Sequence, residues 1–135
     1  MIDEIDFTQL TALTELRFGL TRSPRVIDLT HNLELTFLNL SGLQNTEILD
    51  LPHHNKVNVL LIDGCKALTT GSINAIIDDV HFSAVTDSRY EGIFTLREEW
   101  FEETDVILGP PSAASIDKLR DLRDNYLWFI APELE

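Results

Sequence analysis

The first half of the chain has an apolar pattern that repeats every eleven residues. A triplet with apolar residues at its two ends recurs six times along the chain, as Ile5/Phe7, Leu16/Phe18, Ile27/Leu29, Leu38/Leu40, Leu49/Leu51 and Leu60/Ile62. Apolar residues at alternate positions are typical of a strand with one buried face. Strands that recur at such a spacing predict a meander, a sandwich or a barrel.

Three of these segments resemble the strand segment of leucine-rich repeats: "VIDLTHN", "FLNLSG" and "VLLIDGCKAL". The Asn or Cys after the strand, as at Asn32 and Cys65, stands where that family places its ladder residue. The spacing departs from the family pattern, because a leucine-rich coil takes about 20–29 residues and eleven is half of one. Two arrangements remain: a 22-residue coil with a second strand on its return side, or consecutive antiparallel strands.

We favour the antiparallel arrangement, because two polar loops look like hairpin connections. The loop "PHHN" at 52–55 separates two strand-like segments, and Pro52 ends the first of them. His31 and Asn32 stand at a tight turn, and Asn tolerates the left-handed backbone that such turns need. The sequence thus predicts one α+β domain over 1–135, with a mostly antiparallel, meander-like sheet of about six to nine strands. A short leucine-rich-repeat-like solenoid is the alternative fold.

The second half of the chain predicts two helices among further strands. The helix near 70–80 is capped by Ser72 or Thr70 and has an apolar stripe of Ile73, Ile76, Ile77 and Val80. The second helix, near 112–126, follows Pro111 and is capped by Ser112 or Ser115. The predicted strands are "HFSAVTDS", "YEGIFTLREEWF", "TDVILGPP" and a final strand at 127–131.

The chain is strongly acidic, with 23 Asp and Glu against 10 Lys and Arg and a net charge of −13. Residues 69–135 hold fourteen of these acids, so the second half carries most of the negative field. Such a field repels nucleic-acid phosphates and attracts a basic protein. We expect a cytoplasmic protein without a membrane segment, because the N-terminus is acidic and no apolar run reaches the length of a membrane span. Cys65 is the single cysteine, which excludes an internal disulfide.

The candidate chemical groups predict neither a catalytic site, nor a metal site, nor a cofactor. His53 and His54 are neighbours in an extended loop, where their side chains point in opposite directions and do not bind one ion. Asp78, Asp79 and His81 are interpreted as a solvated helix end, and Cys65 as a structural thiol. The stretch "GPPSAAS" lacks the glycines and lysine of a phosphate loop.

The candidate partner-binding stretch is "LREEWFEETD", residues 96–105. It places Trp100 and Phe101 among five acids: Glu98, Glu99, Glu102, Glu103 and Asp105. Aromatic residues at the centre of an interface carry binding energy, and the charges around them steer the partner. This composition suits a basic groove on another protein.

Taken together, these features favour a small binding protein that is not an enzyme. The leading hypothesis is an immunity protein or antitoxin, which neutralises a basic toxin such as a nuclease by occluding its active or substrate site. The alternative is a small enzyme or ligand-binding domain that uses His81 with Asp78 or Asp79. The alternative requires a concave pocket in which these three side chains converge.

Overall fold

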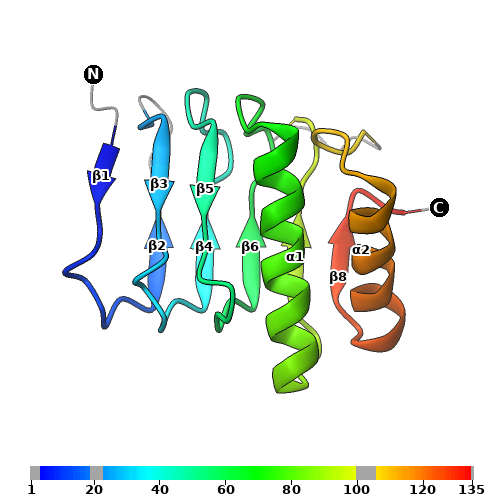
Figure 1. Ribbon diagram of the computed structural model, residues 1–135. Coiled ribbons are helices and arrows are strands. Elements are labelled where there is room, and N and C mark those ends of the chain that lie inside the picture. Colours follow the sequence, from blue (N-terminus) through cyan, green and yellow to red (C-terminus); the bar gives the residue numbers. More distant parts are fainter. Residues whose placement is uncertain (1–3, 19–22, 100–105, 135) are drawn as a thin grey trace.

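Consecutive strands of the first half lie in two opposite layers instead of side by side (Figure 1). The computed structural model describes residues 4–18, 23–99 and 106–134. One layer holds a three-stranded sheet of β1 (Glu4–Asp6), β3 (Val26–Asp28) and β5 (Ile48–Asp50). The other layer holds a five-stranded sheet of β2 (Glu15–Arg17), β4 (Phe37–Asn39), β6 (Val59–Leu61), β7 (Ile93–Thr95) and β8 (Phe129–Ala131). The strands pair in parallel in both sheets.

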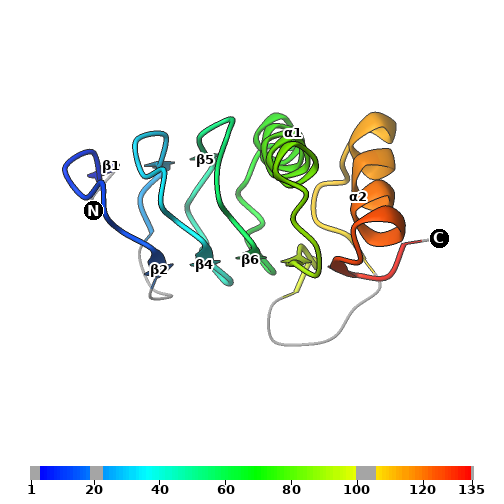
Figure 2. The same ribbon diagram turned by 90° about the horizontal axis from the view of Figure 1, so that it is seen from below.

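The chain winds as a short solenoid in which each coil contributes one element to each layer. In the first three coils both elements are strands. In the last two coils the helices α1 (Thr70–Asp87) and α2 (Ala113–Asn125) replace the strand of the smaller sheet. Figure 2 shows both helices in the layer of β1, β3 and β5, opposite the five-stranded sheet. The architecture is therefore a mixed α/β fold with parallel sheets.

The predicted antiparallel, meander-like sheet is wrong. Glu4 pairs with Val26 and Glu15 with Phe37, so the paired strands among β1 to β6 are 22 residues apart, and strands of this half that are consecutive in sequence are not paired. The apolar-x-apolar triplet fits either arrangement, because it requires only that one face of the strand be buried. The register instead shows a 22-residue coil with a second strand on its return side. This is the other arrangement that the eleven-residue spacing allows. A hairpin of two three-residue strands forms few backbone hydrogen bonds. In the stack, each short strand instead pairs with parallel strands of the neighbouring coils.

The two loops that suggested hairpins are corners at which the chain crosses between layers. Asn32 is buried, and its Nδ2 donates to the carbonyl oxygens of Phe7 and Leu10 at 3.0 and 2.9 Å. Asn55 is also buried, and its Nδ2 donates to the carbonyl oxygen of Pro52 at 3.0 Å. These side chains join neighbouring parts of the coil, so they are structural groups of the interior and not exposed turn residues.

Two residues with the ladder position of leucine-rich repeats link consecutive coils. Asn32 reaches Phe7, and the Cys65 thiol donates to the carbonyl oxygen of Leu40 at 2.9 Å. Both contacts span 25 residues. Thr46 makes a related contact, donating from Oγ1 to the carbonyl oxygen of Pro24 at 2.7 Å. The buried polar residues therefore satisfy backbone carbonyls of the preceding coil, which would otherwise lose a hydrogen bond on burial.

The helices differ from their predicted ranges at one place. The first helix continues through residues 81–87, most of the predicted strand "HFSAVTDS", because Ser83 and Ala84 keep the buried stripe in helical register. Its N-cap is Thr69, whose side chain accepts from the Ser72 backbone N–H. The second helix lies as predicted, and Ser112 accepts from the Ser115 N–H at 3.2 Å. The predicted strand "TDVILGPP" is reduced to an isolated bridge between Arg97 and Ile107.

The core lies between the two layers and consists of the inward residues of each coil. Both apolar members of the triplets are buried from the second coil onward, at Ile27, Leu29, Leu38, Leu40, Leu49, Leu51, Leu60 and Ile62. The helices contribute Ile73, Ile76, Ile77 and Val80 from α1 and Leu119 and Leu122 from α2. The eleven-residue apolar pattern is therefore the inner lining of the solenoid, continued by the helices.

Trp128 and Gly92 provide a test of the packing between the last two coils. Trp128 is buried and its indole N–H donates to the Arg89 carbonyl at 3.0 Å. A Cβ at Gly92 would overlap three ring carbons of Trp128. We expect Gly92→Ala to lower the free energy of unfolding by about 1–3 kcal/mol, measured by urea denaturation.

The matched control is Gly71→Ala in α1, because a Cβ at Gly71 meets nothing within 4 Å. This control should leave the free energy of unfolding unchanged or raise it by up to about 1 kcal/mol, since Ala favours a helix over Gly. Equal stability of the two variants would contradict the packing of Trp128 on Gly92.

Candidate functional site

The outer face of the five-stranded sheet presents one row of residues from all five strands. The middle residue of each strand points into the core, so the residues before and after it point outward. The parallel register aligns the first residues of the strands in one row, namely Glu15, Phe37, Val59, Ile93 and Phe129. This row is charged at β2 and apolar from β4 to β8. Both helices lie on the opposite layer and do not cover it (Figure 2).

The apolar row ends in a cluster of exposed and half-buried residues on the last two coils. We call the cluster the aromatic patch and define it as Tyr90, Ile93, Tyr126, Leu127 and Phe129. Ile93 is paired in register with Phe129, and the rings of Tyr90 and Tyr126 are 5.4 Å apart. Four of the eight large apolar side chains that are exposed among the described residues belong to this patch. A concentration of exposed apolar side chains of this kind is typical of an interaction surface.

Leu127 is the most exposed member of the patch, at 62% of its full accessible surface. Its backbone φ is 59°, in the left-handed region that L-residues with a branched side chain rarely adopt. The position therefore combines an unfavourable backbone conformation with an apolar side chain in water. Strain of this kind is characteristic of positions retained for a contact with another molecule.

The structure describes only the beginning of the predicted partner-binding stretch. Glu98 is exposed and Glu99 is half-buried, paired with Lys66. The Glu98 N–H donates to the Val106 carbonyl at 2.9 Å, so the two ends of the stretch meet beyond the carboxyl end of β7. Five predicted residues lie outside the described ranges: Trp100, Phe101, Glu102, Glu103 and Asp105.

A second polar cluster lies along α1, where three histidines contact three aspartates. His53 Nδ1 is 2.8 Å from Asp79 Oδ1, and His54 Nε2 is 2.9 Å from Asp87 Oδ1. His81 Nε2 is 2.7 Å from Asp121 Oδ2 on α2. His53 and His54 are both exposed loop residues, and they reach different carboxylates as expected for neighbours on an extended chain. The sequence pattern does not indicate that His53 and His54 lie against α1.

Asp78, Asp79 and His81 do not converge on one pocket. Asp78 pairs with Lys118, Asp79 with His53, and His81 with Asp121. Residues three apart lie on the same side of a helix, so Asp78 and His81 both reach α2, whereas Asp79 reaches the corner that carries His53. The arrangement lacks the shared acid–base geometry that the alternative enzyme hypothesis requires.

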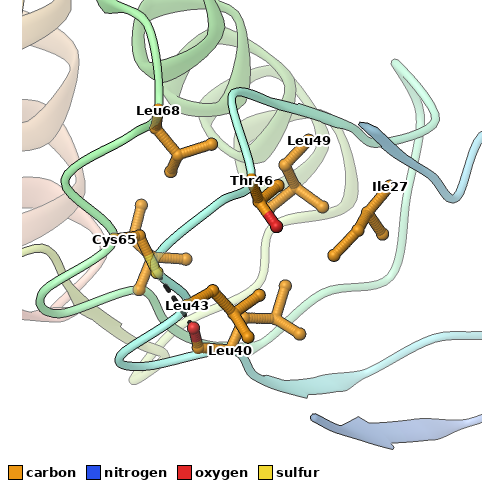
Figure 3. A pocket seen from close by; sticks show the side chains of 8 residues that line it. Ile27, Leu40, Leu43, Thr46, Leu49, Cys65 and Leu68 are labelled. Atoms are coloured by element: carbon orange, nitrogen blue, oxygen red, sulfur yellow. Dashed lines mark hydrogen bonds between the residues drawn. The ribbon is translucent and has the colours of Figure 1, made fainter. Parts of the chain in front are cut away.

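The apolar gap in Figure 3 belongs to the core of the second and third coils. It is lined by Ile27, Leu40, Leu43, Thr46, Leu49, Ile62, Cys65 and Leu68 and is too narrow to hold a water molecule. Burial raises the pKa of the Cys65 thiol to about 11, which keeps the thiol protonated and a poor nucleophile. The gap is therefore a place of loose packing and not a ligand pocket.

No protein-family model, no curated protein and no solved structure matches this chain. Among the described residues, no helix combines the length and the apolar character required to cross a bilayer.

Sequence reasoning missed the aromatic patch, although "YLWFIA" at 126–131 is the densest aromatic and apolar run of the second half. The sequence predicted a final strand at 127–131 without assigning its two faces. In the structure Trp128 and Ile130 are buried, while Leu127 and Phe129 are exposed. The alternation of a strand was visible, but a run that is apolar on both faces does not show which face meets water.

The contact between His81 and Asp121 joins the two helices and has a predictable pH dependence. Hydrogen bonds from Asn125 and then His81 lower the pKa of Asp121 below its usual value. A carboxyl whose pKa is lower in the folded state stabilises the fold above its unfolded pKa and loses this contribution as the pH falls through the folded pKa. Asp121→Asn should therefore lower the free energy of unfolding at pH 7, by less than about 1 kcal/mol for this half-exposed group. Urea unfolding at pH 7 and near pH 2.5 should show that difference disappear at the lower pH.

The backbone conformation of Leu127 predicts an unusual effect of Leu127→Gly. Glycine adopts a positive φ without steric cost, although it loses more entropy on folding. We expect the free energy of unfolding to stay equal or to rise by up to about 1 kcal/mol in urea denaturation. A clear loss of stability would show that Leu127 contributes to the fold.

Proposed function

We propose that this protein binds a basic protein partner and occludes it with the outer face of the five-stranded sheet, as an immunity protein or antitoxin occludes a toxin. The observation that carries the proposal is the aromatic patch, which exposes apolar side chains on a chain of net charge −13. Solenoid proteins use such extended sheet faces for binding. The lone buried thiol fits a reducing compartment such as the cytoplasm.

The patch and the acidic stretch lie close enough to contact one partner. Ile93 opens β7, and Glu98 follows five residues later, at most roughly 17 Å away for an extended chain. A standard interface buries about 800 Å² on each partner, which is roughly 30 Å across. One interface therefore spans the aromatic patch at the amino end of β7 and the acids beyond its carboxyl end.

The two parts of this surface have different physical roles. The apolar side chains of the patch gain free energy when the partner removes them from water. The carboxylates accelerate the encounter with a basic protein and select against acidic ones. A nuclease is a suitable partner within this class, because its substrate site is basic and carboxylates can take the places of phosphates.

The proposal is tested by measuring affinity for a basic toxin of the native host. The product of a neighbouring gene is the first candidate, because immunity proteins are encoded beside their toxins. Calorimetry at low and high NaCl should show weaker binding at high salt. Phe129→Ser should weaken binding more than about tenfold, as expected for an interface anchor.

Leu33→Ser is the matched control for Phe129→Ser, because Leu33 is similarly exposed, at 52% against 57%, but lies outside the five-stranded sheet. The control should leave the affinity unchanged. A variant in which Glu98, Glu99, Glu102 and Glu103 are all replaced by Ala should bind with an affinity that depends less on salt. Binding that is insensitive to salt, or equal losses in the two serine variants, would contradict the proposed surface.

A further inference from the structure

Three side chains beside α1 bring one nitrogen and two oxygen donors together. His53 belongs to the corner after β5, and Asp78 and Asp79 belong to α1. One donor atom from each residue lies within 4.8 Å of the other two. Zinc in open sites takes three protein ligands drawn from imidazole and carboxylate groups, and solvent fills the remaining position. The set therefore has the composition of a transition-metal site and is not merely a group of acids.

The corner that carries His53 is fixed to α1 by buried polar groups. Ser83 Oγ donates to the His53 carbonyl at 2.9 Å and accepts from the Asn55 N–H at 2.8 Å. Asn55 Nδ2 also donates to the carbonyl oxygen of Asp79 at 3.2 Å. Ser83 and Asn55 are both buried, so these contacts are shielded from water. The backbone that holds the donors is thus prearranged, which lowers the entropic cost of binding an ion.

The side chains themselves are also restrained. The His53 ring stacks on Phe82 with 4.1 Å between ring centroids and 21° between planes. The Asp79 carboxylate is 17% exposed and in contact with His53. A cation bound here would offset the negative charge of the two neighbouring carboxylates, Asp78 and Asp79.

Lys118 competes for the same carboxylates. Its ammonium group, on α2, contacts Asp78 Oδ1. An ion bound by Asp78 must share that carboxylate with the ammonium or displace it. Removal of the Lys118 charge should therefore favour the ion.

We propose that His53, Asp78 and Asp79 form a binding site for a divalent ion of the zinc class, with solvent completing its coordination. An imidazole ligand favours such ions over Mg²⁺ and Ca²⁺, which prefer oxygen alone. The site lies in the layer of the helices, opposite the sheet face proposed for the protein partner (Figure 2). It does not depend on that proposed function.

The test uses the full chain without an affinity tag, stripped with a chelator and titrated with Zn²⁺ by calorimetry at pH 7.5. We expect one ion per chain, and weaker binding of Mg²⁺. His53→Ala, Asp78→Asn and Asp79→Asn should each weaken Zn²⁺ binding by about tenfold or more. Lys118→Met should bind Zn²⁺ more tightly than the wild type, a gain that cannot arise from a damaged fold. Circular dichroism of the metal-free variants checks that each is folded.

His54→Ala is the matched control, because His54 is an equally exposed neighbour that contacts a different carboxylate, Asp87. It should bind Zn²⁺ like the wild type. Wild-type binding weaker than about 1 mM would overturn the proposal. So would equal losses in His53→Ala and His54→Ala, or no gain in affinity in Lys118→Met.

Discussion

Parallel pairing between strands 22 residues apart is the interaction on which the rest of the structure depends. Each strand has three residues and makes few hydrogen bonds of its own. Stacked in register, the strands place like residues over like residues, as with Ile27 over Leu49 and Leu38 over Leu60. The result is a continuous apolar interior built from units that would not be stable alone. Asn32 and Cys65 reinforce the stack by satisfying carbonyls of the preceding coil.

The same constraint gives the molecule two different faces. Where strands are replaced by α1 and α2, one layer acquires helical side chains that carry ion pairs such as His81 with Asp121. The five-stranded sheet continues through all coils and keeps an outward row that becomes apolar toward β8. Protein binding is accordingly proposed on the sheet, and ion binding on the helical layer.

The candidate sites show how far sequence reasoning reaches. The acidic stretch is visible in composition, and its described part, residues 96–99, directly follows β7. The aromatic patch joins Tyr90 to Tyr126 and Ile93 to Phe129, residues that are distant in the chain and meet only through the parallel register. His53 and Asp79 are likewise 26 residues apart. Composition does not reveal that such residues are close in space, because their proximity depends on which strands pair and where a helix lies.

The sequence by itself determined which apolar residues of the triplets are buried from Ile27 to Ile62 and where the second helix lies. These properties depend on local periodicity: an alternating triplet buries one strand face whatever its partner, and a capped apolar stripe forms a helix. The tertiary structure alone decided that the strands are parallel and that residues 81–87 continue α1 as helix. It also decided which residues of 127–131 face water. The physical reason is that hydrogen-bonding partners and covering layers are set by contacts between distant segments, and the same eleven-residue pattern satisfies a hairpin and a coil equally well.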